Sequence, residues 1–344
     1  MTPPIIAFFN NKGGVGKTSL VYHLAWMYYD LGLKVVAADL DPQANLTAAF
    51  LDEDRLEEVW EGNSANDYNT IFRCVKPLLS GVGDVAAPSL ERIEDELSLL
   101  IGDLQLSSFE DELSSQWSDC LDSKERAFRV ISAFWRVLSQ AASSHSADVV
   151  LVDLGPNLGA INRAALIASD YIVVPLSPDL FSLQGLKNLG PTVRRWRAEW
   201  HKRIPENPAS NLALPKGKMQ PVGYVILQHG VRSDRPVKAF QKWIERIPHT
   251  YSHEVVREKS ETISVPSNDP NRLALLKHYQ SLMPMAQESR KPIFHLKPAD
   301  GAIGAHVYAV RDVYQDFRRL SEKIAARTGV MFPDDTPPPS KTKR

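Results

Sequence analysis

The stretch Asn11-Lys12-Gly13-Gly14-Val15-Gly16-Lys17-Thr18-Ser19 decides the fold, because it combines a glycine-rich loop with two lysines. An apolar run at residues 5–9 precedes it, and an amphipathic segment at residues 20–31 follows it. A strand, a glycine loop and a helix in this order form a phosphate cradle. Backbone N–H groups close on phosphate oxygens, and the helix N-terminus adds partial positive charge. We therefore expect the residues from Lys12 to Ser19 to bind a nucleotide.

Lys17 and Thr18 carry the side chains that such a cradle needs. In this pattern the lysine reaches the β- and γ-phosphates, and the hydroxyl of the next residue lies on Mg²⁺. The ordinary pattern has a glycine six residues before the lysine, whereas this chain has Asn11 there and a second cation, Lys12, beside it. ATP and Mg²⁺ are the expected cofactors.

Carboxylates end two further segments of the chain. Residues 34–39 predict a buried strand closed by Asp39-Leu40-Asp41-Pro42-Gln43, and residues 148–153 form an apolar run that ends in Asp153. The carboxyl ends of parallel strands meet at the edge of the sheet where ligands bind. We expect Asp153 to reach the Mg²⁺ shell and the pair Asp39 and Asp41 to lie beside the glycine loop.

Strand-like and helix-like segments alternate along the chain, which predicts an α/β fold with a doubly wound, mostly parallel sheet flanked by helices. The expected strands are residues 5–9, 34–39, 98–102, 148–153, 171–175 and 221–227. We assign residues 1–330 to one domain with a variable acidic segment at about 51–145, and residues 331–344 to a disordered basic tail.

Three segments of the second half carry weaker expectations. Residues 200–220 and 245–290 are rich in proline and polar residues, which predicts loops or irregular insertions. Residues 301–327 predict a helix with one core-facing side. That side consists of Ile303, Val307, Val310, Phe317, Leu320 and Ile324.

The charge of the chain is divided unevenly along its length. The net charge is −1, yet residues 51–125 carry 19 acidic against 5 basic side chains, and residues 126–344 have a compensating excess of basic ones. Such a split favours two faces with different partners, or simply two solvated faces. With 43% hydrophobic residues and no apolar run of about 18 residues, we expect no membrane span and no signal peptide. Cys74 and Cys120 are expected to be buried thiols in a reducing compartment.

Four ordered blocks resemble the ParA-like branch of the ParA/MinD family of deviant Walker A P-loop ATPases. They are the loop at 11–19, V-V-A-A-D-L-D-P-Q at 35–43, V-V-L-V-D-L-G-P-N-L-G at 149–159 and V-V-P-L-S-P-D-L-F-S-L-Q-G-L at 173–186. The resemblance implies a weak, partner-stimulated ATP hydrolase. It covers residues 3–190 well and the remainder loosely.

Carried over to this chain, the resemblance implies a role for each polar residue. Lys12 matches the signature lysine that reaches the partner subunit's ATP, which implies a homodimer with ATP sandwiched at its interface. Lys17 remains in the nucleotide cradle. Asp41 matches the residue that positions the attacking water, and Asp39 supports the Mg²⁺ shell. A ParB-like or other activating protein is the implied partner. The expected setting is cytoplasmic, nucleoid-associated if the protein binds DNA, and without a membrane anchor.

Nonspecific DNA is a further implied partner, since a basic segment follows the last matching block. Trp196 and Trp200 lie among its cations at helical spacing, where they pack inward more often than they contact DNA. The candidate phosphate contacts are Arg194, Arg195, Arg197, Lys202 and Arg203.

This chain departs from the family pattern at two places. Gly155 stands before Pro156, where the family commonly has two prolines. The family's D-x-R-T-N pattern is replaced by Gln-His-Gly-Val-Arg-Ser-Asp-Arg-Pro at 228–236, which leaves Gln228 as the candidate adenine contact.

Two other functions stay open from the sequence. The first is a nucleotide-switched regulator that binds another protein and does not use DNA, which the acidic 51–125 segment favours. The second is a metabolic P-loop enzyme of the amidotransferase-type synthetases, which Lys12 disfavours. The absence of cysteine ligands after Asp153 argues against the iron–sulfur members of the superfamily.

Overall fold

A computed structural model describes residues 2–61, 70–229, 231–232, 235–236, 238–257, 269–279 and 281–333. For residues 61, 228, 229, 231, 232, 235, 236, 238 and 239 it describes the backbone alone. The expected tail beyond residue 333, the side chain of Gln228 and most of the 228–236 loop therefore lie outside the described residues.

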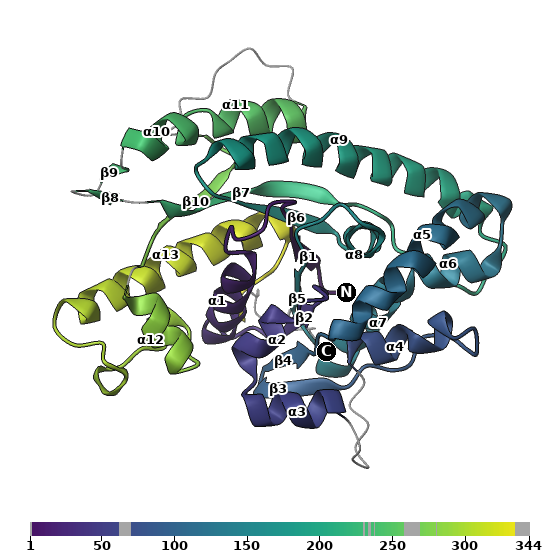
Figure 1. Ribbon diagram of the computed structural model, residues 1–344, viewed down its shortest axis with the longest axis horizontal. Coiled ribbons are helices and arrows are strands. Elements are labelled where there is room, and N and C mark those ends of the chain that lie inside the picture. Colours follow the sequence, from purple (N-terminus) through teal and green to yellow (C-terminus); the bar gives the residue numbers. More distant parts are fainter. Residues whose placement is uncertain are drawn as a thin grey trace, which may run out of the picture.

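Within these residues an eight-stranded sheet forms the centre of the molecule, in the order β10-β7-β6-β1-β5-β2-β4-β3 (Figure 1). Neighbouring strands are parallel except for β3, which pairs antiparallel with β4 at one edge. The strands are β1 (Ile5–Phe8), β2 (Val35–Asp39), β3 (Leu90–Glu94), β4 (Leu97–Leu100), β5 (Val149–Asp153), β6 (Tyr171–Leu176), β7 (Gln220–His229) and β10 (Arg272–Lys277). A short pair, β8 (Val231–Arg232) and β9 (Arg235–Pro236), lies apart from this sheet. The predicted doubly wound, mostly parallel sheet is confirmed.

Helices cover both faces of the sheet, so alternate residues of the central strands enter two separate cores. Ile6 and Phe8 of β1 face one core, while Ile5 and Ala7 face the other. The first core is covered by α1 (Lys17–Asp30), α2 (Asn45–Phe50), α3 (Glu53–Glu61), α12 (Leu282–Glu288) and α13 (Ala305–Thr328). The second is covered by α4 (Ile71–Leu79), α5 (Glu110–Asp119), α6 (Glu125–Ile131), α7 (Ala133–His145), α8 (Ala160–Ala168), α9 (Leu180–Arg203), α10 (Lys238–Ile244) and α11 (Ile247–Tyr251).

The structure corrects two expectations about the second half. Residues 245–290 are not only irregular, because they contain β10, which pairs parallel with β7 and forms an edge of the sheet. The predicted apolar side of the last helix begins too early. Ile303 precedes α13 and is 65% exposed, and the first buried residue of the helix is Val313.

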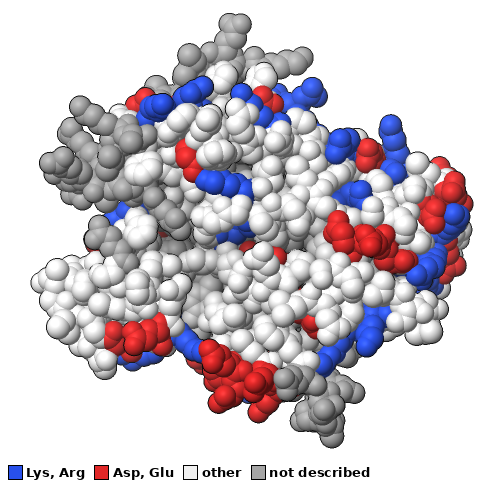
Figure 2. Space-filling view, in the orientation of Figure 1, with Lys and Arg blue, Asp and Glu red and all other residues white. Residues whose placement is uncertain are grey.

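Acidic side chains gather over α3 and β3 and again near α5 and α6 (Figure 2). Beneath this acidic surface the segment still contributes to the core, since Leu113 and Trp117 of α5 and the thiols of Cys74 and Cys120 are buried. The expected buried, free cysteines are thus confirmed. No helix among the described residues is both long and apolar enough to cross a bilayer.

Candidate nucleotide-binding site

The glycine loop lies between β1, in the middle of the sheet, and the first turn of α1. Gly14 (φ 70°) and Gly16 (φ 87°) adopt the left-handed conformation that glycine tolerates best. Gly16 occupies the N-cap position of α1 and offers no side-chain cap, so the first N–H groups of the helix stay free for an anion. This geometry suits phosphate oxygens.

Lys17 is 7% exposed, and its Nζ donates to the carbonyl of Lys12 at 3.3 Å. Burial lowers the pKa of Lys17, while the carboxylates of Asp153 and Asp41 raise it in part. A buried ammonium between a loop carbonyl and two acids lacks a strong partner, and a phosphate would supply one.

The loop opens into a cavity of about 730 Å³. One side of this cavity belongs to the loop and to Asp41, and the other to α2, α12 and the turn after α12. Its lining includes Gly13, Gly14, Lys17, Thr18, Ser19, Asp41, Ala48, Pro156, Met283 and Arg290. A triphosphate at the glycines would lie directly against Asp41.

The carboxylates of Asp39 and Asp153 end adjacent parallel strands, and the two residues are register partners. Burial raises the pKa of both carboxylates. Like-charge repulsion from Asp41 adds to this effect on both, and repulsion from Asp39 adds to it on Asp153. Their hydrogen bonding differs. Asp39 accepts hydrogen bonds from the Thr47 N–H (2.8 Å), the Thr47 hydroxyl (2.9 Å) and the Asp41 N–H (3.2 Å).

Asp153 presents both of its buried oxygens without a hydrogen-bond donor in good geometry, although the nearby Thr18 hydroxyl favours its ionised form. Unpaired buried carboxylate oxygens beside a hydroxyl form a donor set that fits Mg²⁺. No cluster of three or more His, Cys, Asp or Glu ligands occurs in the described parts of the chain. Mg²⁺ in nucleotide sites is usually bound by one or two protein oxygens together with substrate phosphates and water.

Asp41 is 6% exposed and follows the end of β2. Its Oδ1 accepts a hydrogen bond from the Gln43 N–H at 3.0 Å, and its carboxylate packs on the backbone of Gly155. The loop after β5 therefore forms a wall of the site beside Asp41.

Lys12 belongs to the glycine loop, and its side chain is 26% exposed. Its ammonium is ion-paired with Asp179, and Asp179 also caps α9 by accepting from the Ser182 N–H at 2.8 Å. Two exposed apolar residues, Leu180 (45%) and Phe181 (70%), begin α9 beside this pair. The ammonium lies 5.9 Å from the centre of the Phe181 ring.

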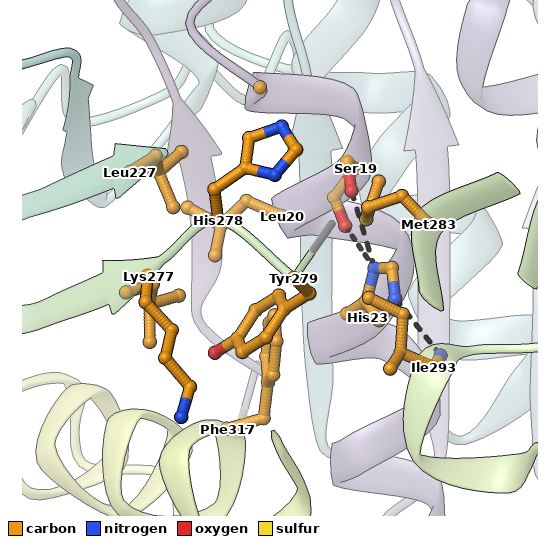
Figure 3. Close-up of a pocket in the computed structure, with 12 residues that line it drawn as sticks. Ser19, Leu20, His23, Leu227, Lys277, His278, Tyr279, Met283, Ile293 and Phe317 are labelled. Atoms are coloured by element: carbon orange, nitrogen blue, oxygen red, sulfur yellow. Dashed lines mark hydrogen bonds between the residues drawn. The ribbon is translucent and has the colours of Figure 1, made fainter. Parts of the chain in front are cut away.

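A second cavity of about 160 Å³ adjoins the glycine loop through Gly16 and Ser19 (Figure 3). Its walls come from four elements. They are the end of β7 (Leu227), the end of β10 with the two residues after it (Lys277, His278 and Tyr279), α1 (His23) and α13 (Phe317). The His23 ring binds the Ser19 carbonyl through Nδ1 (2.7 Å) and accepts from the Ile293 N–H through Nε2 (3.2 Å). It also stacks on Phe317 at 5.0 Å.

The sequence reasoning missed the part of this cavity formed by residues 277–279. The signal available was Arg-Leu-Ala-Leu-Leu-Lys at 272–277, a short apolar run whose carboxyl end faces the same edge of the sheet as β1 and β5. The irregular composition around it concealed the strand.

The five basic residues expected to contact DNA all lie on α9, but they differ in environment. The guanidinium groups of three donate to backbone carbonyls: Arg194 to Glu254, Arg197 to Met219, and Arg203 to Trp117 and Glu199. Arg195 and Lys202 are exposed. Trp196 and Trp200 are buried, as their helical spacing predicts.

The fold and the site together define a P-loop nucleotide-binding protein. A family model described as AAA domain matches residues 4–205, which is more than half of the chain, so the chain belongs to that family. Within it the chain is a ParA/MinD-family ATPase of the ParA-like partition and positioning group. This confirms the family that the four sequence blocks indicate.

Curated relatives agree with this assignment. An uncharacterized protein of Methanocaldococcus jannaschii is 28% identical over 72% of this chain and 80% of its own length. The sporulation initiation inhibitor protein Soj of Bacillus subtilis is 30% identical over 55% of this chain, and protein IncC of Escherichia coli is 31% identical over 55%. The matches cover 64% of Soj and 45% of IncC.

Solved structures share the fold over nearly the whole chain. Protein DIP2308 of Corynebacterium diphtheriae superposes with a TM-score of 0.69 at 23% identity, covering 94% of this chain and 98% of that one. The ATP complex of Cyanothece McdA(D38A) has a TM-score of 0.61 at 15% identity, with 96% and 98% covered. A putative plasmid partition protein of Borrelia burgdorferi bound to AMPPNP has a TM-score of 0.56 at 18% identity, with 94% and 99% covered.

Proposed function

We propose that this protein is an ATP-driven switch that dimerises around ATP, binds nonspecific DNA as a dimer and positions or segregates a cargo. The cargo would be a plasmid, a chromosome or a protein assembly, and a ParB-like or other partner would stimulate hydrolysis. The observation that carries the proposal is that Lys12 of the glycine loop is partly exposed and lies beside the exposed Leu180 and Phe181. Exposed apolar side chains around a partly exposed lysine suit a surface that a second subunit covers.

The proposed mechanism divides the work among this chain's own residues. Lys17 and the N–H groups of the loop bind the β- and γ-phosphates. Thr18 and Asp153 would hold Mg²⁺, with Asp39 organising the loop between them, and the metal would neutralise charge that develops on the phosphates. Asp41 orients the attacking water. Lys12 of each subunit contacts the ATP of the other, so each site is complete only in the dimer.

The small cavity supports an assignment for the base. It continues from the loop glycines and has apolar and aromatic walls, which suit a flat purine ring. We place adenine against residues 277–279 and Leu227, and the Gln228 contact stays a prediction.

The DNA part of the proposal is best tested on the two exposed cations, because replacing Arg194 or Arg197 would also break hydrogen bonds to backbone carbonyls. With ATP, wild-type protein should retain random duplex at low salt. The double variant Arg195→Glu with Lys202→Glu should weaken binding to all sequences alike. It should also lower the log–log salt slope by about 0.9 for each phosphate that is no longer neutralised.

A matched control makes the same change in charge elsewhere. Lys76→Glu with Arg92→Glu alters two exposed cations of the acidic segment and should leave DNA retention unchanged. If ATP-bound wild-type protein does not bind duplex even at low salt, the DNA part of the proposal is wrong. The switch would then act on a protein partner.

A further inference from the structure

Gly155 brings the loop after β5 into direct contact with Asp41. A β-carbon built on Gly155 would lie 3.1 Å from Oδ1 and 3.4 Å from Cγ of Asp41. Carbon and oxygen atoms normally settle at about 3.5–4.0 Å, so a side chain at this position would push the carboxylate aside. The space beside Asp41 therefore exists because residue 155 has no side chain.

The loop that carries Gly155 is held firmly. The buried Asn162 of α8 donates through Nδ2 to the Gly155 carbonyl at 2.9 Å and to the Asn157 carbonyl at 2.7 Å. On the opposite side, the Pro156 ring lies 3.8 Å from a β-carbon built on Gly13 of the phosphate loop. Gly155 is thus a fixed surface between the phosphate loop and Asp41.

The position of the Asp41 carboxylate depends on packing against a glycine more than the position of the Asp39 carboxylate does. Asp39 also packs on a glycine, Gly102, but three hydrogen bonds lock its carboxylate. For the Asp41 carboxylate, the Gln43 N–H is the one donor found among the described residues, and it binds Oδ1. The carboxylate as a whole, and Oδ2 with it, is therefore positioned by this one hydrogen bond and by packing against Gly155.

We propose that Gly155 is a positioning residue for ATP hydrolysis. Its bare backbone lets the Asp41 carboxylate lie close to the sheet, with Oδ2 directed at the attacking water. The inference rests on the proposed water-orienting role of Asp41 and adds a residue to it. Gly155 itself contacts neither the nucleotide nor the water, and it acts through the carboxylate.

The variant Gly155→Ala tests the inference with a single added carbon. The backbone of Gly155 is outside the positive-φ region, so alanine adds crowding without backbone strain. We expect kcat to fall by about 3- to 10-fold, because displacing a catalytic group by a few tenths of an ångström is costly. The Kd of a fluorescent ADP analogue should stay within about twofold, since the phosphate loop is unchanged.

Gly83→Ala is the matched control. A β-carbon at residue 83 would make an ordinary 3.6 Å contact with Pro77. Neither residue lines the nucleotide cavity, so wild-type kcat is expected. A second variant, Asn162→Ala, frees the Gly155 carbonyl without adding atoms beside Asp41. It should lower kcat as well, with thermal unfolding and analogue binding showing that the protein is folded.

A double-mutant cycle separates the inference from the proposed function. If Gly155 acts through Asp41, adding Gly155→Ala to Asp41→Ala should change kcat by less than about 1.5-fold. Wild-type turnover in Gly155→Ala, with slow turnover in Asp41→Ala, would overturn the inference and leave the role of Asp41 intact. The inference would also be overturned if Gly155→Ala lowered kcat by the same factor in the Asp41→Ala background as in wild-type protein. Wild-type turnover in Asp41→Ala would instead exclude Asp41 from the hydrolytic mechanism, and the proposed role of Gly155 would then be excluded as well.

Discussion

The Lys12 ammonium is ion-paired with the Asp179 carboxylate of the same chain, at the N-cap of α9. Partial burial alone would raise the pKa of Asp179, but Lys12 and the Ser182 N–H outweigh it, so this pKa lies below its usual value. In the proposed dimer Lys12 contacts the partner's ATP, so it has to leave Asp179 first. The ion pair therefore competes with dimerisation.

Asp179→Asn should strengthen the ATP-dependent dimer. Asparagine can still accept the Ser182 N–H and cap the helix, but it no longer holds Lys12 as a charged partner. A partly exposed ion pair contributes about 0.5–1 kcal/mol, and two such pairs break when one dimer forms, so the dimer dissociation constant should be about 5- to 30-fold lower. Analytical sedimentation in the presence of a slowly hydrolysed ATP analogue measures this dissociation constant. Asp122→Asn, which breaks an exposed pair with Lys124, is the control, and an unchanged constant in Asp179→Asn would show that the pair does not compete.

Asp41→Ala should bind ATP and accumulate as a dimer, yet hydrolyse it at least about 10-fold more slowly, a loss of roughly 1.4 kcal/mol in transition-state stabilisation. The reason is that Asp41 lines the phosphate cavity without belonging to the phosphate loop. Steady-state turnover at saturating ATP gives the rate, and light scattering gives the state. Turnover at the wild-type rate would exclude Asp41 from the mechanism.

Asp153→Asn should weaken the dependence of nucleotide binding on Mg²⁺. The two unpaired oxygens of Asp153 become one oxygen and one amide, which repels a cation. We expect the Mg²⁺ concentration for half-maximal binding of a fluorescent ATP analogue to rise by about 10-fold or more, while binding in EDTA stays close to wild type. Superimposable Mg²⁺ titrations would place the metal elsewhere.

Stability should decrease between pH 7 and pH 5 because of His23. Burial lowers the pKa of His23 to about 4, so the folded state keeps this ring neutral while the unfolded chain protonates it. A histidine with a depressed pKa stabilises the fold fully above its unfolded pKa of about 6.5, and this contribution is lost as the pH falls toward 4. The loss at pH 5 is about 2 kcal/mol.

The matched variant is His23→Gln, which does not titrate. Its free energy of unfolding in urea should be lower than that of wild type at pH 7, since glutamine cannot stack on Phe317, but it should change less between pH 7 and pH 5. Comparing the two proteins cancels contributions from Asp39 and Asp153. Equal pH dependence in both would mean that His23 is not the titrating group.

Much of the site was predictable because it is encoded locally. Glycines at fixed spacing after an apolar run require a tight loop, and a carboxylate at the end of a buried strand lies at the carboxyl edge of the sheet. The positions of Lys17, Asp39 and Asp153 follow from these rules. The pairing of Lys12 with Asp179 does not, since it joins residues 167 apart in the chain.

The errors came from elements whose environment is set by tertiary packing. β10 lies between polar stretches of sequence, and it is recognisable as a strand only from its parallel pairing with β7. The residues before and at the start of α13 continue its apolar periodicity, yet Ile303 is exposed and the first buried residue of the helix is Val313. Three arginines of α9 donate to backbone carbonyls of segments distant in sequence, which no local charge count reveals.

The proposed joining of two subunits by ATP through Lys12 is tested most directly by measuring molar mass with multi-angle light scattering in the presence of ATP and Mg²⁺. Wild-type protein should have the mass of a dimer with ATP and of a monomer with ADP. Lys12→Ala should still bind a fluorescent ATP analogue, because Lys17 and the loop N–H groups are intact, but it should remain a monomer. A Lys12→Ala protein that dimerises with ATP as wild type does would contradict this mechanism.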